Sequence, residues 1–147
     1  MGDLSYELRA ENGLTVLGIF TTASNASPQA IGDLWRRFHA MGDQNVIAVR
    51  QDDAVYCVYC EYEGDWTKSF TVVIGCAVAR DASIPEGMKK IDVQAGTFAV
   101  LQALGELPKG VFEAWDEVWK TPLDRRYQAD FDCYKKDGAV SVHVGVR

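Results

Sequence analysis

Residues 107–119 read Leu-Pro-Lys-Gly-Val-Phe-Glu-Ala-Trp-Asp-Glu-Val-Trp, and they give the clearest structural signal in the chain. Their apolar side chains recur at helical spacing, which predicts an amphipathic helix over residues 108–121. These side chains are Val111, Phe112, Trp115, Val118 and Trp119. Two indoles four residues apart bury a large area. They therefore either fill the core or form the wall of a pocket for a flat or cationic molecule.

A strand predicted over residues 127–134 follows this helix, and its side chains alternate between two faces. One face carries Asp130, Asp132 and Tyr134, and the other carries Phe131 and Cys133. The alternation alone slightly favours an Asp face exposed to solvent. If Asp132 is buried, loss of hydration raises its pKa. The carboxylate then needs a hydroxyl partner, such as Tyr127 or Tyr134, when no cation is bound.

The composition is that of one domain, residues 1–147. Of the 147 residues, 48% are hydrophobic and 24% are charged, which suits one compact core. The formal net charge is −6, and Lys and Arg occur in pairs without a larger cluster. This pattern argues against direct nucleic-acid binding and modestly favours a cationic ligand. The chain starts without a signal-peptide pattern and has no apolar run of membrane-spanning length, so we expect a cytoplasmic protein with no membrane contact.

The two halves of the sequence, residues 1–80 and 88–147, repeat the same order of elements. Proline, an aliphatic residue and tryptophan recur at equal offsets, as Pro28, Ile31 and Trp35 and again as Pro108, Val111 and Trp115. We interpret this as an internal duplication of β-β-α-β-β modules related by a pseudo-twofold axis. The predicted fold class is α+β, with antiparallel sheets, two main helices and a central groove where the modules meet.

The expected elements follow from apolar periodicity and turn residues. Helices are expected over residues 28–41 and 108–121, and strands over 4–9, 14–21, 55–62, 70–79, 89–93, 97–104, 127–134 and 140–146. The strand over 70–79 is apolar on both faces and should be central in a sheet. Glu11-Asn12-Gly13 and Ala95-Gly96 are expected to close two hairpins.

Several motifs together resemble the GyrI-like, or AraC-type, effector-binding domain family. They are Val93–Val100, Leu107-Pro108, the tryptophans at 115 and 119, Arg126-Tyr127, Asp130–Tyr134, and in the first half Tyr56–Tyr59, Tyr62-Glu63 and Ile74-Gly75. The resemblance implies a duplicated fold whose central groove binds small, often aromatic and cationic, molecules against a buried acid. It also implies a stand-alone binding module, because no DNA-binding helices of the regulator type precede the domain.

The buried acid of that family is usually glutamate in a Phe-Glu-x-Tyr pattern, and the matching residue here is Asp132, one methylene shorter. Asp132 could therefore contact a ligand directly or through water. The expected ligand-binding residues are Asp132, Trp119, Trp115, Tyr127 and Tyr134, with Tyr59, Glu61 and Phe98 as further candidates. Trp119 is favoured over Trp115, because Trp115 has a counterpart in Trp35 and so fits a structural role in both modules.

Two other functions stay open at this point. Some members of the family are thought to hydrolyse strained electrophiles, and Asp132 with Tyr127 or Tyr134 could supply the base and the acid. Others act by binding a protein, through an acidic surface, and a homodimer is also possible. Binding of a small organic cation is favoured over catalysis, because it requires no special catalytic geometry.

No metal or cofactor is expected. Cys57 and Cys60 have the spacing of a metal or redox pair, but a strand would send the two thiols to opposite faces. All four cysteines, at 57, 60, 76 and 133, are expected to be buried free thiols. His39 and His143 have no neighbour in the sequence that suggests a catalytic dyad.

Overall fold

The computed structural model describes residues 6–24, 29–41, 51–52, 54–64, 68–103, 109–121, 123–126 and 128–147. The first half contains β1 (Glu7–Glu11), β2 (Leu14–Ala23), α1 (Gln29–Ala40), β3 (Val55–Cys60) and β4 (Phe70–Val78). The second half contains β5 (Lys89–Val93), β6 (Gly96–Gln102), α3 (Lys109–Lys120), β7 (Ala129–Tyr134) and β8 (Val140–Gly145). Each half thus has the predicted order β-β-α-β-β.

All these strands belong to one antiparallel sheet of eight strands, in the order β1-β6-β8-β7-β3-β4-β2-β5. The strands β1, β2, β3 and β4 of the first half correspond to β5, β6, β7 and β8 of the second. Exchanging each strand for its counterpart gives the same order read from the other edge of the sheet. A pseudo-twofold axis therefore passes between β7 and β3, where the two halves join. The duplicated α+β fold that the sequence predicts is confirmed.

The two predicted hairpins are wrong. β1 pairs with β6, and β2 pairs with β5, so the first strand of each half lies against the other half. Glu11 pairs with Gly96, and Leu14 pairs with Val93. Two residues separate these pairs in each segment of the chain, so the register of β1 with β6 continues into that of β2 with β5. Gly13 allows the two backbones to lie close together at the bend, because a Cβ at this position would lie 2.5 Å from the carbonyl oxygen of Val93. A local turn signal does not distinguish such a bend from a chain reversal.

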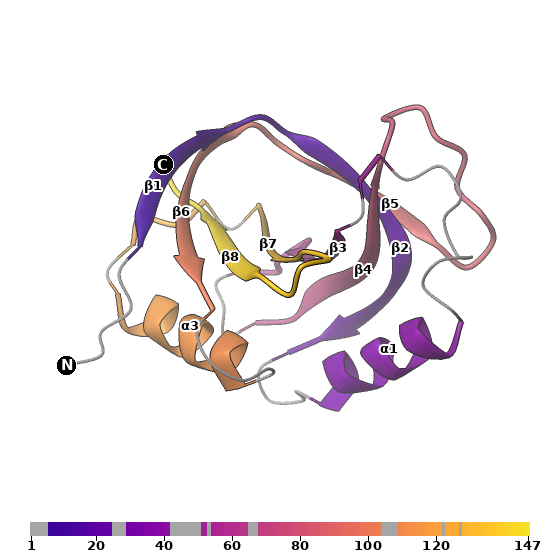
Figure 1. The fold of residues 1–147 in the computed structure, drawn as a ribbon, viewed down its shortest axis with the longest axis horizontal. Coiled ribbons are helices and arrows are strands. Elements are labelled where there is room, and N and C mark those ends of the chain that lie inside the picture. The colour runs from indigo at the N-terminus through magenta and orange to yellow at the C-terminus, as the bar shows by residue number, and fades with distance from the viewer. Residues whose placement is uncertain are drawn as a thin grey trace.

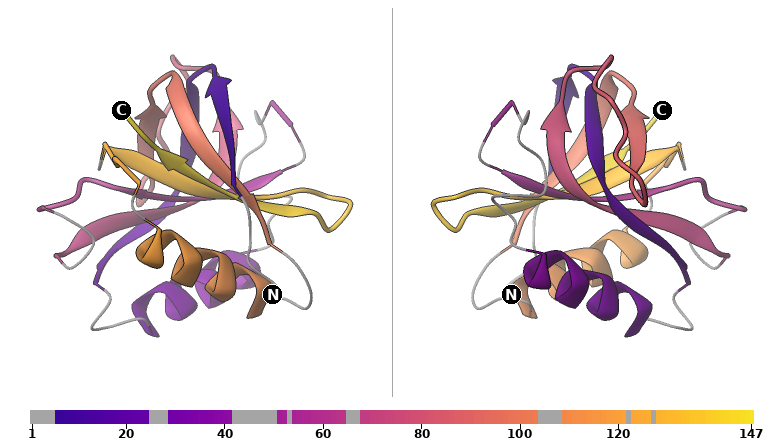
Figure 2. Two further views of the ribbon diagram at one scale, coloured as in Figure 1. Left: turned by 90° about the vertical axis from the view of Figure 1, so that its left-hand side faces the viewer. Right: turned by 90° about the vertical axis from the view of Figure 1, so that its right-hand side faces the viewer.

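The sheet is strongly curved, and both helices lie on one side of it (Figures 1 and 2). In Figure 1 the strands β1 and β2 arch over the middle of the sheet, and the helices lie beneath it. Among the described residues, no helix has the length and apolar character needed to cross a membrane.

Each face of the sheet has its own core. The concave face is filled by a cluster that includes Val16, Val58, Val73, Phe98 and Phe131. On the other face, Leu34 and Phe38 of α1 pack on Val72 and Ile74, while Ala114 and Val118 of α3 pack on Leu101, Val142 and Val144. The apolar side of each helix therefore packs on the strands of its own half.

The prediction for the cysteines is confirmed. All four are buried thiols outside any disulfide, with Cys57 in the cluster under α1 and Cys60 in the concave cluster. β4 lies between β3 and β2 and is buried at almost every position, as expected for a central strand. β3 ends at Cys60, earlier than predicted, because Glu61 adopts a left-handed backbone with φ of 51°.

Gly75 on β4 allows the closest contact between two strands. It lies opposite Gly18 of β2, and a Cβ on Gly75 would stand 1.9 Å from the carbonyl oxygen of Leu17. Gly75→Ala should therefore lower the free energy of unfolding by about 1–3 kcal/mol, measured by chemical denaturation. Gly32 of α1 is the matched control, because nothing lies within 4 Å of its added Cβ. Gly32→Ala should raise stability by about 0.5–1 kcal/mol. A Gly75→Ala protein as stable as the parent would contradict this account.

Candidate functional site

Asp132 lies at the junction of the two halves. It is on β7, 0% exposed, and faces Cys57 of β3 directly across the ladder that joins the modules. The pleat turns Asp132 toward the helices, while Phe131 and Cys133 turn toward the concave core. The pattern alone had slightly favoured a solvent-exposed aspartate face, but the structure shows that Asp132 is buried beneath α3.

Three neutral donors surround the carboxylate. The Tyr59 hydroxyl donates to Oδ2 at 2.7 Å and the Trp115 Nε1–H donates to Oδ1 at 2.7 Å. The Tyr134 hydroxyl also reaches Oδ2, at a longer 3.4 Å. Tyr134 was one of the two hydroxyl partners expected from the sequence, but the two closest donors come from β3 and α3. The site therefore joins both halves of the protein.

Burial raises the pKa of Asp132 from its ordinary 3.8 to about 6, although the bonds from Tyr59, Trp115 and Tyr134 lower it. Burial and the nearby Asp132 charge also raise the pKa of Tyr59 and of Tyr134. Both phenols therefore stay protonated and act as donors. The result is a carboxylate that is ionised at neutral pH, yet incompletely compensated for its lost hydration.

The aromatic residues around Asp132 follow the internal symmetry. The ring of Tyr59 packs edge-on against Trp115 with centroids 5.1 Å apart, and the ring of Tyr134 packs in the same way against Trp35 at 4.9 Å. Tyr59 stands two residues after Cys57, and Tyr134 stands two after Asp132. The duplication thus places a thiol where a second carboxylate would lie. Two adjacent buried carboxylates would repel each other, so one acid is the better arrangement.

A second buried acid, Asp130, has a structural ion pair. Arg125 Nη2 lies 2.8 Å from Asp130 Oδ2, and both side chains are almost fully buried. The Tyr62 hydroxyl and the Gly145 backbone N–H also donate to Asp130. The guanidinium of Arg125 lies 5.9 Å from the ring of Trp115, next to the Asp132 site. Sequence reasoning missed Arg125, although an arginine five residues before an acidic strand position was a usable signal.

Other predicted site residues lie elsewhere. Phe98 is in the concave core, on the opposite face of the sheet from Asp132. The Arg126 guanidinium lies over its ring, with Cζ 5.0 Å from the ring centroid. Glu61 is exposed and pairs with Lys89 at 3.0 Å. Trp119 is 40% exposed, and the indole that bonds Asp132 belongs to Trp115. The preference for Trp119 as the indole that faces a ligand stays a prediction. Tyr127 lies outside the described residues.

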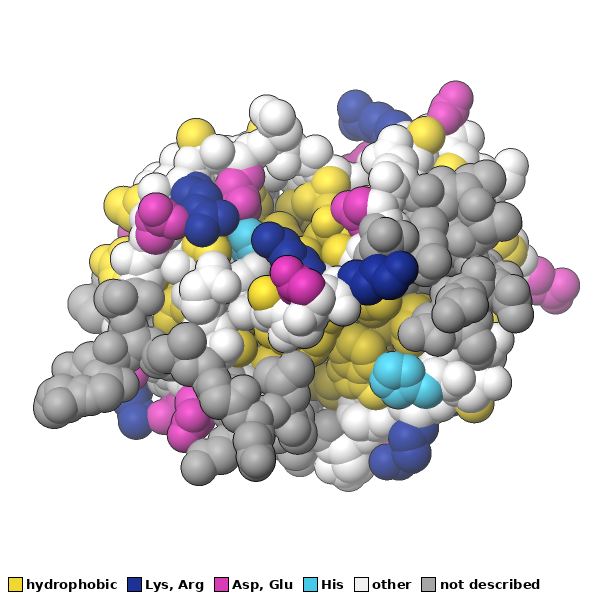
Figure 3. Space-filling view, in the orientation of Figure 1, with side chains coloured by type: hydrophobic (Ala, Val, Ile, Leu, Met, Phe, Trp, Pro, Cys, Tyr) yellow, Lys and Arg dark blue, Asp and Glu magenta, His cyan; other side chains and the backbone are white. Residues whose placement is uncertain are grey.

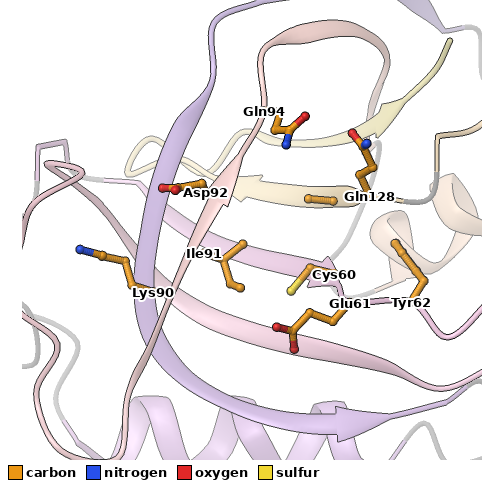
Figure 4. A pocket seen from close by; sticks show the side chains of 9 residues that line it. Cys60, Glu61, Tyr62, Lys90, Ile91, Asp92, Gln94 and Gln128 are labelled. Carbon is orange, nitrogen blue, oxygen red and sulfur yellow. The ribbon is translucent and has the colours of Figure 1, made fainter.

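Two cavities are found on the concave side of the sheet, and neither is lined by Asp132. One, of about 400 Å³, lies between β5 and the end of β3 and has Glu61, Tyr62 and Asp92 around it (Figure 4). The other, of about 450 Å³, is lined by residues of β1, β6, β7 and β8. On the face shown in Figure 3, hydrophobic side chains are visible between charged ones.

Comparison with known proteins gives one matching family. The model described as integron-associated effector binding protein matches residues 7–146. A similar solved structure, an integron cassette protein from the mobile metagenome of Vibrio cholerae, has 29% identity and a TM-score of 0.80, and the match covers 99% of both chains.

Two further proteins are similar over different lengths. SAV2435, solved bound to tetraphenylphosphonium, is 18% identical with a TM-score of 0.73, and the match covers 97% of this chain and 94% of that one. At this identity the likeness shows the shared fold. YobU of Bacillus subtilis (strain 168), named as a candidate transcriptional regulator, is 29% identical over 94 residues. That match covers 61% of this chain and 58% of YobU, so less than two thirds of the relative is represented.

The raised pKa of Asp132 predicts a specific pH dependence of stability. The folded protein holds the proton more tightly than the unfolded chain, so the favourable contribution is complete below pH 3.8 and is lost as the pH rises to about 6. Asp132→Asn removes this dependence. The stability of the variant relative to the parent should rise by up to about 1.4 kcal/mol per pH unit in that window.

Denaturation at several pH values measures this difference. Asp116→Asn is the charge-matched control, since Asp116 is an exposed residue of α3 paired with Lys120. Its replacement should change stability by no more than about 1 kcal/mol. If the difference between Asp132→Asn and the parent is flat from pH 4 to 6, the carboxyl is not strained by burial.

Proposed function

The chain belongs to the family of integron-associated effector binding proteins, and we propose that its effector is a lipophilic aromatic cation that pairs with Asp132. The observation that carries this proposal is a fully buried carboxylate to which three neutral groups of the described residues donate hydrogen bonds. Such a group gains from a positive charge in a way that a surface carboxylate does not, because its own hydration has already been lost.

The surroundings suit an aromatic cation better than a small inorganic one. Trp115, Tyr59 and Tyr134 bring aromatic rings next to the carboxylate through their N–H and O–H groups. A cation over an aromatic face gains roughly 0.5–2 kcal/mol, and the higher value applies to desolvated sites such as this one. A diffuse organic cation also loses little hydration on entry, so the charge can be buried at lower cost.

The relatives support the same reading. SAV2435 was solved with tetraphenylphosphonium bound and shares the fold with a TM-score of 0.73. Tetraphenylphosphonium is a bulky cation covered by phenyl rings, which is the ligand chemistry that an acid among aromatic residues would accept. It is therefore the probe of choice for this chain.

Binding requires the site to open. Trp115 and Tyr59 each donate a hydrogen bond to the carboxylate at 2.7 Å, so a ligand that pairs with the same oxygens directly would have to displace them. We propose that the ligand takes over the carboxylate from the Trp115 indole, which then serves as an aromatic wall. Trp119, exposed one turn further along α3, would contact a ligand that extends beyond the buried site. Tyr127 remains a candidate wall by its place in the sequence.

Titration calorimetry with tetraphenylphosphonium tests the charge pairing. Asp132→Asn should weaken binding at pH 7.5 by about 10-fold or more, corresponding to a loss of about 1.4 kcal/mol. Asp116→Asn, which removes the same charge from the exposed face of α3, should bind like the parent. Triphenylphosphine oxide, a neutral molecule with the same phenyl groups, should bind both proteins equally. Equal affinity of the parent and Asp132→Asn for the cation would refute the proposal.

The pH dependence of binding gives a second test. Because a cation pairs with the ionised carboxylate, affinity should fall as pH drops below about 6, approaching a tenfold loss per pH unit. In Asp132→Asn the affinity should be nearly independent of pH in this range. A decline of the same size in both proteins would place the titrating group elsewhere.

A further inference from the structure

Three polar side chains form a relay on the concave face of the sheet. Ser141 Oγ lies 2.7 Å from His143 Nε2, and His143 Nδ1 lies 2.8 Å from Glu11 Oε1. Ser141 and His143 are two residues apart on β8 and so share a face, while Glu11 comes from β1 at the other end of the chain. The imidazole is stacked on Phe131 with centroids 4.4 Å apart, which fixes the plane of the ring.

The relay lines a cavity of about 450 Å³, a volume within the range of small-molecule sites. Phe98, Phe131 and Tyr56 supply apolar walls, and Lys135 lies among the polar lining residues. The pleat of the sheet separates this cavity from Asp132, which projects from the opposite face. This cavity is therefore spatially separate from Asp132.

The two bonds assign the roles of the imidazole nitrogens. A glutamate carboxylate only accepts, so the ring proton lies on Nδ1 and the lone pair of Nε2 accepts the Ser141 hydroxyl. Burial lowers the pKa of His143, the bond and charge of Glu11 raise it, and the charges of Arg9 and Lys135 lower it slightly. The ring is therefore neutral at pH 7 and able to take a proton from the serine.

The ladder also brings an amide next to the serine. Gln102 of β6 lies directly opposite Ser141, so its side chain projects from the same face beside it, and it lines the same cavity. An amide N–H in this position is a donor for the negative oxygen that forms when a serine attacks a carbonyl.

From this arrangement we propose that the concave cavity is a second site, with esterase activity toward small carboxylic esters. Ser141 is the nucleophile and His143 is the general base. Glu11 is a positioning residue that holds the imidazole, and Gln102 is the donor to the oxyanion. The apolar walls and the volume of the cavity select a short-chain or singly aromatic acyl group.

The chemistry balances without an oxidant or cofactor. The Ser141 oxygen attacks the ester carbonyl carbon while its proton passes to His143 Nε2. The tetrahedral adduct releases the alcohol, which takes this proton, and leaves an acyl-serine. Water then attacks the acyl carbon and gives a proton to Nε2. The carboxylic acid departs as the Ser141 oxygen recovers that proton, so one ester and one water give one acid and one alcohol.

A fluorophosphonate probe tests the nucleophile in the unmodified protein. The wild-type chain should form a covalent adduct, and peptide mass mapping should locate it at Ser141. The mapping needs no variant, so a folding defect cannot obscure the result. Absence of an adduct, or an adduct at another residue, overturns the proposal.

Hydrolysis of p-nitrophenyl butyrate tests the relay. Ser141→Ala and His143→Ala should lower kcat by about 100-fold or more. Ser83→Ala, at an exposed residue of the loop before β5, should hydrolyse the ester like the wild type. Hydrolysis that is unchanged in a folded Ser141→Ala protein, verified by circular dichroism, overturns the assignment.

Glu11→Gln distinguishes a positioning role from a structural one. It should lower kcat by about 10²–10⁴-fold with little change in KM, because the imidazole loses its orientation. The apparent pKa in the kcat/KM profile should move downward, because Glu11 raises the pKa of His143. A profile that keeps its midpoint would show that Glu11 does not act through the imidazole.

Discussion

The antiparallel pairing of β3 with β7 is the constraint on which the rest of the molecule depends. It joins the two halves across the pseudo-twofold axis and sets Cys57 directly opposite Asp132. Its register decides which side chains face the helices, since a shift of one residue would send Asp132 into the concave core. β1 of the first half pairs with β6, and β5 of the second half pairs with β2, so each half supplies the last strand at the other half's end of the sheet.

The two buried acids of β7 differ in their partners. Asp132 has lost its hydration, and its neutral donors restore only part of that energy. Asp130, two residues away on the same face, has an arginine partner instead. The difference between the two acids separates their roles, because Asp130 stabilises the junction while Asp132 is left able to accept a charge.

The two faces of β8 have different surroundings. Val142 and Val144 alternate with Ser141 and His143, so the two valines pack beneath α3 and the polar pair lines the concave cavity. The sequence shows this alternation but does not show the partner of His143. Glu11 is 132 residues away, and it reaches the imidazole only because β1 lies against the second half.

The sequence by itself determined the elements and their duplication, because periodicity, turn residues and matching offsets are local properties. The choice of Asp132 as the candidate acid came from the family resemblance, since the alternation alone slightly favoured an Asp face exposed to solvent. It did not determine which strands pair, because Asn12-Gly13 fits both a reversal and a bend. Nor did it determine which tryptophan meets Asp132. Trp115 and Trp119 lie on one helical stripe, and only the packing angle of α3 on the sheet puts the Trp115 nitrogen within 2.7 Å of the carboxylate. Burial and long-range contacts arise from tertiary structure, so the energetics of the site arise there as well.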